Sequence, residues 1–137
     1  LVMASDLRAS SNTRLVDQKP DRSHDIALGS DMGSYTWTLN GRSYGNHIPL
    51  PVGRGERVEL AFRNTTMMFH PMHLHGHTFQ LRTSSGLDGP RKDTVIVPPM
   101  ETVTVAFDAD NPGDWATHCH NAYHQDAGMM TVIEYQK

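Results

Sequence analysis

The chain has only one cysteine, Cys119, among its 137 residues. A single cysteine cannot form an intrachain disulfide, so the sequence predicts a fold that depends on a hydrophobic core rather than on covalent bridges. A chain of this length suits one compact domain and is long enough to bury such a core.

The sequence also lacks long apolar runs and clusters of positive charge. No stretch of about 18 apolar residues is present, so no membrane span is predicted. The first residues, LVMASDLRASSNTR, lack the apolar core of a signal peptide. Lysine and arginine together number 12 against 15 acidic residues, and the net charge is −3. Because nucleic-acid binding requires clustered basic residues, no nucleic-acid partner is expected.

Histidine, in contrast, is abundant and unevenly distributed. Seven of the nine histidines fall in two short segments, FHPMHLHGHTF and THCHNAYHQDAGMM. The first segment contains His70, His73, His75 and His77, and the second contains His118, His120 and His124, with Cys119 between its first two histidines. Expression tags are consecutive and terminal, so these clusters indicate a metal site instead.

The rest of the chain alternates between short strand-like segments and turns. Residues 56–63, ERVELAFR, place Val58, Leu60 and Phe62 on one face, which is the period-two pattern of a half-buried strand. Further strands are predicted at 34–39, 78–82, 94–97, 102–107 and 129–135, and Asn40-Gly41 is a typical hairpin turn. No segment shows a sustained helical period. The sequence therefore predicts an all-β sandwich or barrel over residues 25–137, preceded by a polar lead-in or linker at 1–24.

Strand geometry sorts the clustered side chains into two sets. Side chains alternate across a strand, so residues two apart share a face. His118 and His120 should therefore face one way and Cys119 the other, while His70 should face away from the pair His73 and His75. If the two strands are neighbours, the sequence predicts two metal sites on opposite sides of one backbone segment.

Each set suits a different metal chemistry. His70, Cys119 and His124, with Met129 available, form the ligand set of a blue-copper electron-transfer centre, because methionine is an unlikely zinc ligand. The second set contains four imidazoles, from His73, His75, His118 and His120. These suit copper, zinc, iron or nickel, and copper is the preferred interpretation because of the adjacent first set.

The two histidine segments resemble the C-terminal copper signatures of the multicopper oxidases, a family that includes laccases and ascorbate oxidases. KDTVIVPP followed by ETVTVAFDADNPGDWATHCH is similar to the strands that lead into the HCH segment of that family. YTWTLNGRSY resembles the start of its last cupredoxin domain. The resemblance covers about residues 25–137 and implies a cupredoxin-type Greek-key β-sandwich of about eight strands.

The resemblance also implies roles for individual residues. His70, Cys119 and His124 would bind type 1 copper with Met129 as axial ligand, His73 would bind type 2 copper, and His75, His118 and His120 would bind the type 3 pair. Electrons from a small reducing substrate would pass from the type 1 site through Cys119 and its flanking histidines to a trinuclear cluster that reduces dioxygen to water. An extracytoplasmic location, periplasmic or secreted, follows from the family alone.

Only half of the trinuclear site is present, since the family completes it with two further HxH motifs and this chain has none. The missing ligands would come from N-terminal cupredoxin domains of the same enzyme or from a second copy of the chain. The isolated domain is expected to bind type 1 copper with little or no oxidase turnover. A free-standing blue-copper carrier is one alternative, but it leaves four histidines unused. A structural or copper-buffering module that kept its sites after losing catalysis is the other.

Other conspicuous residues have simpler interpretations. His77 is predicted to pack or to hydrogen-bond near the ligands, and Trp37 and Trp115 are predicted core aromatics. Met67, Met68 and Met72 are expected to fill gaps in the core. Asn64-Thr65-Thr66 matches a glycosylation sequon, although a loop after a strand explains it equally well.

Overall fold

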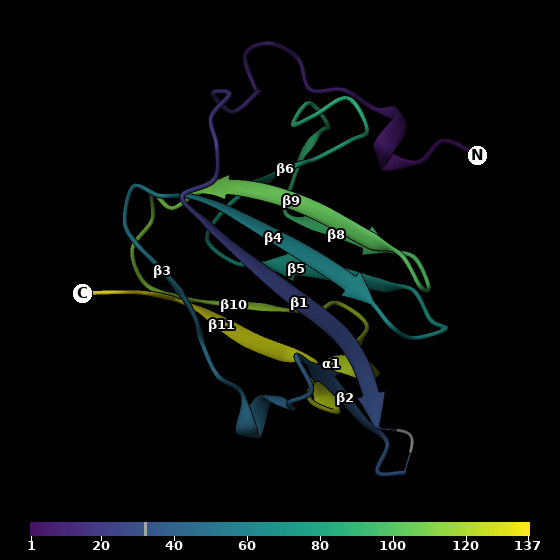
Figure 1. Cartoon of the computed structure of the whole chain (residues 1–137). Helices are drawn as coiled ribbons and strands as arrows, with labels where there is room; N and C mark the ends of the chain where they lie inside the picture. The colour runs from purple at the N-terminus through teal and green to yellow at the C-terminus, as the bar shows by residue number, and fades with distance from the viewer. Residues whose placement is uncertain (32) are drawn as a thin grey trace.

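Two β-sheets packed face to face form the protein in the computed structural model, which describes residues 1–31 and 33–137 (Figure 1). The first sheet has the strand order β2-β1-β4-β9-β6-β7 and the second has the order β3-β11-β10-β5-β8. The strands of the first sheet are β1 (Arg22–Asp31), β2 (Thr36–Leu39), β4 (Arg57–Asn64), β6 (Phe79–Leu81), β7 (Arg91–Lys92) and β9 (Thr102–Asp108). Those of the second are β3 (Leu50–Val52), β5 (His70–Leu74), β8 (Thr94–Val97), β10 (Asp114–Cys119) and β11 (Met130–Tyr135).

This arrangement confirms the predicted β-sandwich. Eleven strands occur in the described residues where about eight were expected, and three of them, β3, β6 and β7, are only two or three residues long. β6 lies within the strand predicted at 78–82, whereas β3 and β7 were not predicted, because segments this short do not show a clear period-two pattern in the sequence. Most of the remaining strands lie within one or two residues of their predicted positions.

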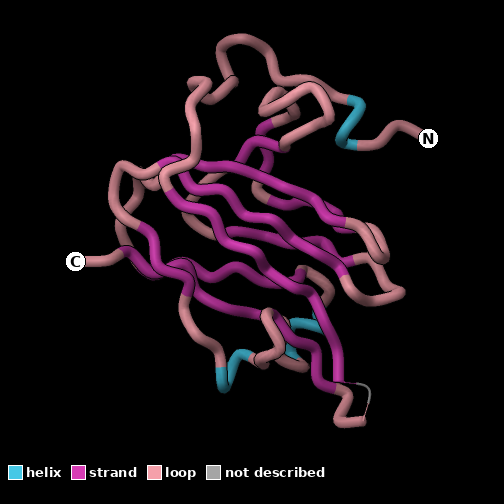
Figure 2. The backbone as a smooth tube through the Cα atoms, in the orientation of Figure 1, coloured by secondary structure: helices cyan, strands magenta, loops and turns pink. Residues whose placement is uncertain are grey.

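Helices contribute little, as the backbone trace shows (Figure 2). They are η1 (Ala4–Asp6), η2 (Tyr44–Asn46) and α1 (Ala122–Asp126), each of three to five residues. Among residues 1–31 and 33–137, no helix has the length and apolar character needed to cross a bilayer.

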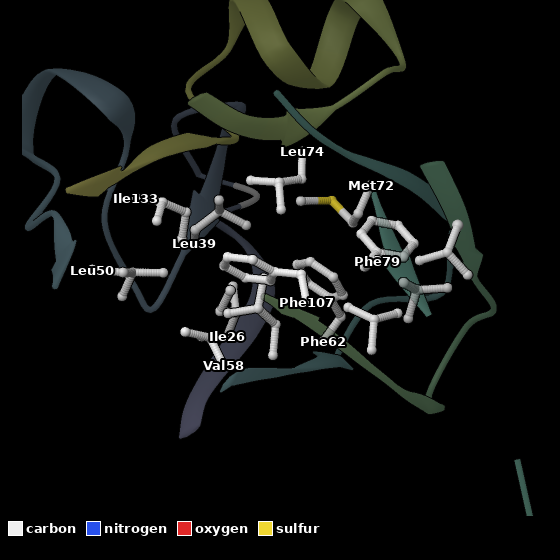
Figure 3. Packing of buried hydrophobic residues seen from close by; sticks show 14 of the residues in the cluster. Ile26, Leu39, Leu50, Val58, Phe62, Met72, Leu74, Phe79, Phe107 and Ile133 are labelled. Atoms are coloured by element: carbon white, nitrogen blue, oxygen red, sulfur yellow. The ribbon is translucent and has the colours of Figure 1, made fainter. Parts of the chain in front are cut away.

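The core lies between the two sheets (Figure 3). In β4, Val58, Leu60 and Phe62 are fully buried, as the alternating pattern predicts. Phe107 of β9 pairs with Val58, and Met72 of β5 joins the same cluster from the opposite sheet. The prediction of a core role is right for Met72 but wrong for two other methionines. Met67 is 80 % exposed and Met68 is 45 % exposed, because both lie in the loop between β4 and β5, outside the sandwich.

The first strand begins earlier than the sequence suggests. β1 starts at Arg22, within the predicted lead-in, because it pairs in parallel with β4 from the Arg22–Val58 register onward. The preceding residues are anchored as well: the buried Arg57 donates through Nη1 to the carbonyl oxygen of Val16 at 2.8 Å and through Nε to Asp108 at 2.6 Å. The polar sequence of the predicted lead-in therefore gave no sign that backbone hydrogen bonds attach this segment to the first sheet.

The turn at Asn40-Gly41 forms, but it does not connect two long strands. Both residues have positive φ angles, 53° and 75°, as the sequence favours. The turn closes on an isolated bridge between Leu39 and Arg42. β2 instead pairs with the preceding β1, and the chain beyond Arg42 is drawn away because the Tyr44 N–H donates to the carbonyl oxygen of Gly128 at 2.9 Å.

Phe62→Ala should destabilise the protein by about 3–5 kcal/mol, because it deletes a fully buried aromatic ring from the centre of the sandwich. Ile96→Ala is the matched control, since Ile96 lies on the outer face of β8 and is 56 % exposed; its cost should stay within about 0.5 kcal/mol. Chemical denaturation measures both values. Equal effects for the two variants would show that this core is wrongly described.

Candidate metal centre

The pairing of β5 with β10 brings the two histidine segments together. Its register sets Cys119 opposite Met72 and His118 opposite His73. Because directly paired residues share a face of the sheet, Cys119 points into the core with Met72, while His118 points outward with His73. His70 lies two residues before Met72 and therefore shares the inward face.

His70, Cys119 and His124 meet on that inward face. The Nδ1 atoms of the two histidines are 3.1 Å apart, and the Cys119 Sγ lies 3.7 Å from Nδ1 of His70 and 3.6 Å from Nδ1 of His124. His124 reaches this position from α1, which begins just after β10 and is capped by Asn121, whose side chain accepts a hydrogen bond from the Tyr123 N–H. All three side chains are buried.

These three donor atoms fit a single metal ion. A point equidistant from them lies roughly 2.0 Å from each, close to the usual metal–nitrogen distance and slightly short of the usual metal–sulfur distance of about 2.3 Å. Among the described residues, only this group brings three histidine, cysteine or acidic side chains within 4.8 Å of one another. The donor set, two imidazoles and one thiol, is that of a trigonal blue-copper site.

Met129 and Trp37 complete the surroundings of this group. Met129 is fully buried, its N–H donates to the carbonyl oxygen of His124, and its carbonyl oxygen accepts from the Cys119 N–H. The Trp37 ring lies over His124 with a centroid separation of 3.9 Å and meets the edge of His70 at 5.2 Å. Trp37 packs against the core as predicted, but its contact with two candidate ligands was not visible in the sequence.

Burial keeps the three donors uncharged in the metal-free protein. Desolvation, followed by the proximity of His124, lowers the pKa of His70 to about 4, and desolvation also lowers the pKa of His124. Burial raises the pKa of the Cys119 thiol, an effect that the Asn121 backbone opposes. Both imidazoles are therefore ready to bind a cation at neutral pH, whereas the thiol must first lose its proton.

Asn64 and Thr66 orient His70, a role that sequence reasoning missed. The Thr66 hydroxyl lies 2.8 Å from Nε2 of His70, and it also donates to the side-chain oxygen of Asn64 at 2.8 Å. The hydroxyl proton is thus used on Asn64, so His70 donates from Nε2 and keeps the lone pair of Nδ1 free. Asn64 is buried, and its amide nitrogen bonds three backbone carbonyl oxygens. Glycan attachment at this sequon is incompatible with that environment.

The second set gathers on the outward face of the same two strands. Nε2 of His75 lies 2.9 Å from Nε2 of His118. The His73 ring is 4.8 Å from that of His75 and 5.6 Å from that of His118, and His120 is 5.7 Å from His73. The structure therefore brings His73, His75, His118 and His120 together, more loosely than the inward group.

Backbone contacts orient two of these rings. Nδ1 of His118 donates to the carbonyl oxygen of Cys119 at 3.1 Å, and Nδ1 of His73 donates to that of Asp93 at 2.8 Å. Each ring then presents Nε2 as an acceptor, the form that binds metals. Burial is the largest cause of the lowered pKa of His118, with neighbouring histidines adding to it and the Cys119 backbone opposing it.

The outward set is open on one side. His75 and His120 are exposed, and a cleft of about 700 Å³ lies beside the set, lined by residues that include His73, His75 and Asp93. The inward group is closed by protein, while the outward group leaves room for further ligands.

Fold and site together define a β-sandwich with a buried histidine–cysteine–histidine centre and a second, open histidine group one residue away. The family model for multicopper oxidases matches residues 17–137. The chain belongs to the multicopper oxidase family. The solved multicopper oxidase McoA from Aquifex aeolicus superposes with a TM-score of 0.80 and 31 % identity, over 93 % of this chain and 32 % of that one. This likeness confirms the predicted cupredoxin-type fold.

Curated relatives extend the comparison. The multicopper oxidase MmcO of Mycobacterium tuberculosis is 52 % identical over 119 residues, which cover 85 % of this chain and 24 % of the relative. A copper resistance protein A homolog of Pseudomonas syringae pv. tomato is 34 % identical over 120 residues, 88 % of this chain and 20 % of the relative. The chain thus spans between a fifth and a quarter of the length of these relatives.

Thr66→Val should weaken copper binding at the inward group about 10- to 100-fold, because it removes the acceptor that holds the His70 ring in its metal-binding tautomer. Titration followed through the blue absorption of a copper–thiolate bond measures the change. Thr65→Val is the control, since the Thr65 hydroxyl donates to the Leu28 carbonyl oxygen and, among the described residues, forms no hydrogen bond with a histidine. Equal copper affinities in the two variants would show that Thr66 does not orient His70 for binding.

Copper binding at the inward group should weaken as pH falls from 7 to 5, by about tenfold per unit, because one thiol proton must be displaced. The raised pKa of Cys119 keeps that proton bound throughout this range, whereas His70, with a pKa of about 4, stays neutral and displaces none. The blue band, titrated at several pH values, gives the slope. A pH-independent affinity would show that the thiol is already ionised in the metal-free protein.

Proposed function

We propose that the chain is the C-terminal cupredoxin domain of a laccase-like multicopper oxidase. His70, Cys119, His124 and Met129 would hold type 1 copper, and His73, His75, His118 and His120 would supply half of a trinuclear copper site. Copper bound in these sites supplies one-electron oxidation of a reducing substrate and, once the trinuclear site is complete, reduction of dioxygen to water.

The observation that carries this proposal is the junction between the two donor groups. Cys119 belongs to the inward group, and the adjacent His118 belongs to the outward group. Their side chains leave opposite faces of β10, yet Nδ1 of His118 also bonds the Cys119 carbonyl oxygen at 3.1 Å. A peptide bond and a hydrogen bond thus connect the two groups over a very short path, which suits electron transfer between them.

The same observation disfavours a free-standing electron carrier. A carrier needs only the inward group, and four outward histidines would then be incidental. Their arrangement supports a binding role instead, because His73 and His118 each donate from Nδ1 to a backbone carbonyl oxygen and so carry a lone pair on Nε2. The openness of the outward group supports completion by another cupredoxin domain of the same enzyme or by a second copy of the chain.

Domain limits and location are part of the proposal. The proposed domain, residues 25–137, extends back to Arg22 because β1 begins there, and the residues before it would lead in from a preceding domain. An extracytoplasmic location is proposed from the family alone. A small organic or metal-ion reductant would donate electrons near the type 1 site.

His118→Ala tests the proposal in the complete oxidase. Dioxygen consumption should fall more than about 100-fold, because the loss of a ligand should exceed the 10- to 100-fold cost of losing a partner of a ligand. The blue absorption should remain, since His118 contributes no side-chain atom to the inward group. Oxygen-electrode assays and absorption spectra of the same preparation provide the two measurements.

His24→Ala is a suitable control, because His24 lies on β1 and bonds the Pro51 carbonyl oxygen, outside both groups. Retained dioxygen reduction in His118→Ala would contradict the proposed role of the outward group, whereas a protein that transfers electrons equally well with and without His118 would be a simple carrier. Joint loss of colour and turnover would show that the two groups are not separate sites.

A further inference from the structure

The turn that follows β5 presents His75 to the outward group. His75 is exposed, and within the described part of the chain its ring bonds only to His118, so the backbone determines where the ring points. The His75 N–H donates to the Ala116 carbonyl oxygen of β10 at 2.9 Å. The His75 carbonyl oxygen lies 3.1 Å from Nδ1 of His77. Both peptide groups of His75 are therefore tethered, one by β10 and the other by His77.

His77 itself has both ring nitrogens occupied. Its Nδ1 faces a carbonyl oxygen, which only accepts, so Nδ1 carries the proton. Nε2 then accepts from the Tyr135 hydroxyl at 2.7 Å, and the Tyr135 oxygen accepts from the Asn111 N–H at 3.2 Å. Burial is the largest cause of a raised pKa at Tyr135, which keeps the phenol protonated as a donor. Since no nitrogen is left free, His77 is not a ligand.

Packing holds the same turn on its other side. The His77 ring stacks on Tyr135 with an interplanar angle of 13° and contacts Phe107 at a centroid distance of 4.9 Å. Gly76 adopts φ +74°, and a Cβ atom there would lie 2.4 Å from the Trp115 ring. The Asn111 amide donates to the Gly76 carbonyl oxygen at 2.9 Å. Each residue of the turn is thus held to the sandwich by its own hydrogen bond or packing contact.

We propose that His77 is a positioning residue for copper binding by the outward group: by donating to the His75 carbonyl oxygen, it fixes the approach of His75 to His118. Tyr135, at the end of β11, holds His77 in the required tautomer. The inference rests on the proposed function in assuming that the outward histidines bind copper. It adds two residues from outside the ligand set, one of which comes from the last strand.

His77→Phe tests the inference in the full chain, because phenylalanine keeps the ring packing and removes both hydrogen bonds. Copper(II) is titrated. The blue band reports copper at the inward group, and the total bound copper minus that amount reports copper at the outward group. The affinity of the outward group should fall about 10- to 100-fold, with the blue band unchanged. His77→Asn should retain most of the affinity, since its amide nitrogen can take the place of Nδ1.

The matched control is His47→Phe. His47 makes the same kind of contacts, with Nδ1 bonded to the Tyr44 carbonyl oxygen at 2.6 Å and its ring stacked on Tyr44, but it belongs to neither histidine group. Copper binding should not change in this variant. If His77→Phe fails to fold, Tyr135→Phe, which deletes only the hydroxyl, carries the same expected loss.

Two results of the copper titration overturn the inference. One is wild-type affinity of the outward group in His77→Phe, or in Tyr135→Phe where that variant replaces it. The other is equal weakening in His77→Phe and His77→Asn. Nitrogen-15 shifts provide a readout without metal, and a His77 ring protonated at Nε2 rather than Nδ1 also contradicts the inference. Failure of the proposed function looks different, because the wild-type chain would then bind copper only at the inward group.

Discussion

The alternation of side chains along β10 is the constraint on which the rest of the site depends. His118 and Cys119 are neighbours in sequence, so an extended backbone must send them to opposite faces of the sheet. Pairing with β5 then adds His70 on the inner side and His73 on the outer side through a single register. A slip of one residue would reverse every one of these directions and dismantle both groups at once.

The two faces impose different physical conditions on their histidines. On the inner face, His70 and Cys119 border the hydrophobic core, and desolvation favours the neutral forms of both. That environment shields the donors from solvent, and the buried Thr66 orients the His70 ring. On the outer face, His75 and His120 remain exposed, and hydrogen bonds to backbone carbonyl oxygens orient His73 and His118. The chain therefore contains one closed centre and one open centre that share a backbone segment.

Much of this was accessible from the sequence because the relevant signals are local. Parity within HPMHLH and HCH needs only an extended backbone, and buried positions such as Phe62 follow from period two. Features that depend on partners distant in sequence were not accessible. β1 extends to Arg22 through parallel pairing with β4, which polar residues do not indicate. Asn64 and Thr66 match a sequon in the sequence. Nothing local shows that their side chains turn inward toward His70.

The methionines also show that local sequence does not determine whether a side chain is buried. Met67 and Met72 lie beside the same histidine segment, yet Met67 is exposed and Met72 is fully buried, because only Met72 belongs to a strand. Proximity in sequence to a metal motif therefore does not place a side chain near the metal or in the core.

The turn after β5 shows why an open centre needs support from beyond its ligands. Pairing with β10 and β8 fixes His73 within β5, but His75 lies past the end of the strand, where its N–H still bonds Ala116 of β10 while its carbonyl oxygen faces the His77 ring instead of a strand. The His77 and Tyr135 hydrogen bonds replace that missing constraint, and they connect the His75 peptide to the last strand of the domain. Under the proposed function, further ligands would complete the outward group, and His75 would then be oriented before they arrive. A rigid turn achieves this by limiting the conformational freedom that would otherwise be lost on metal binding.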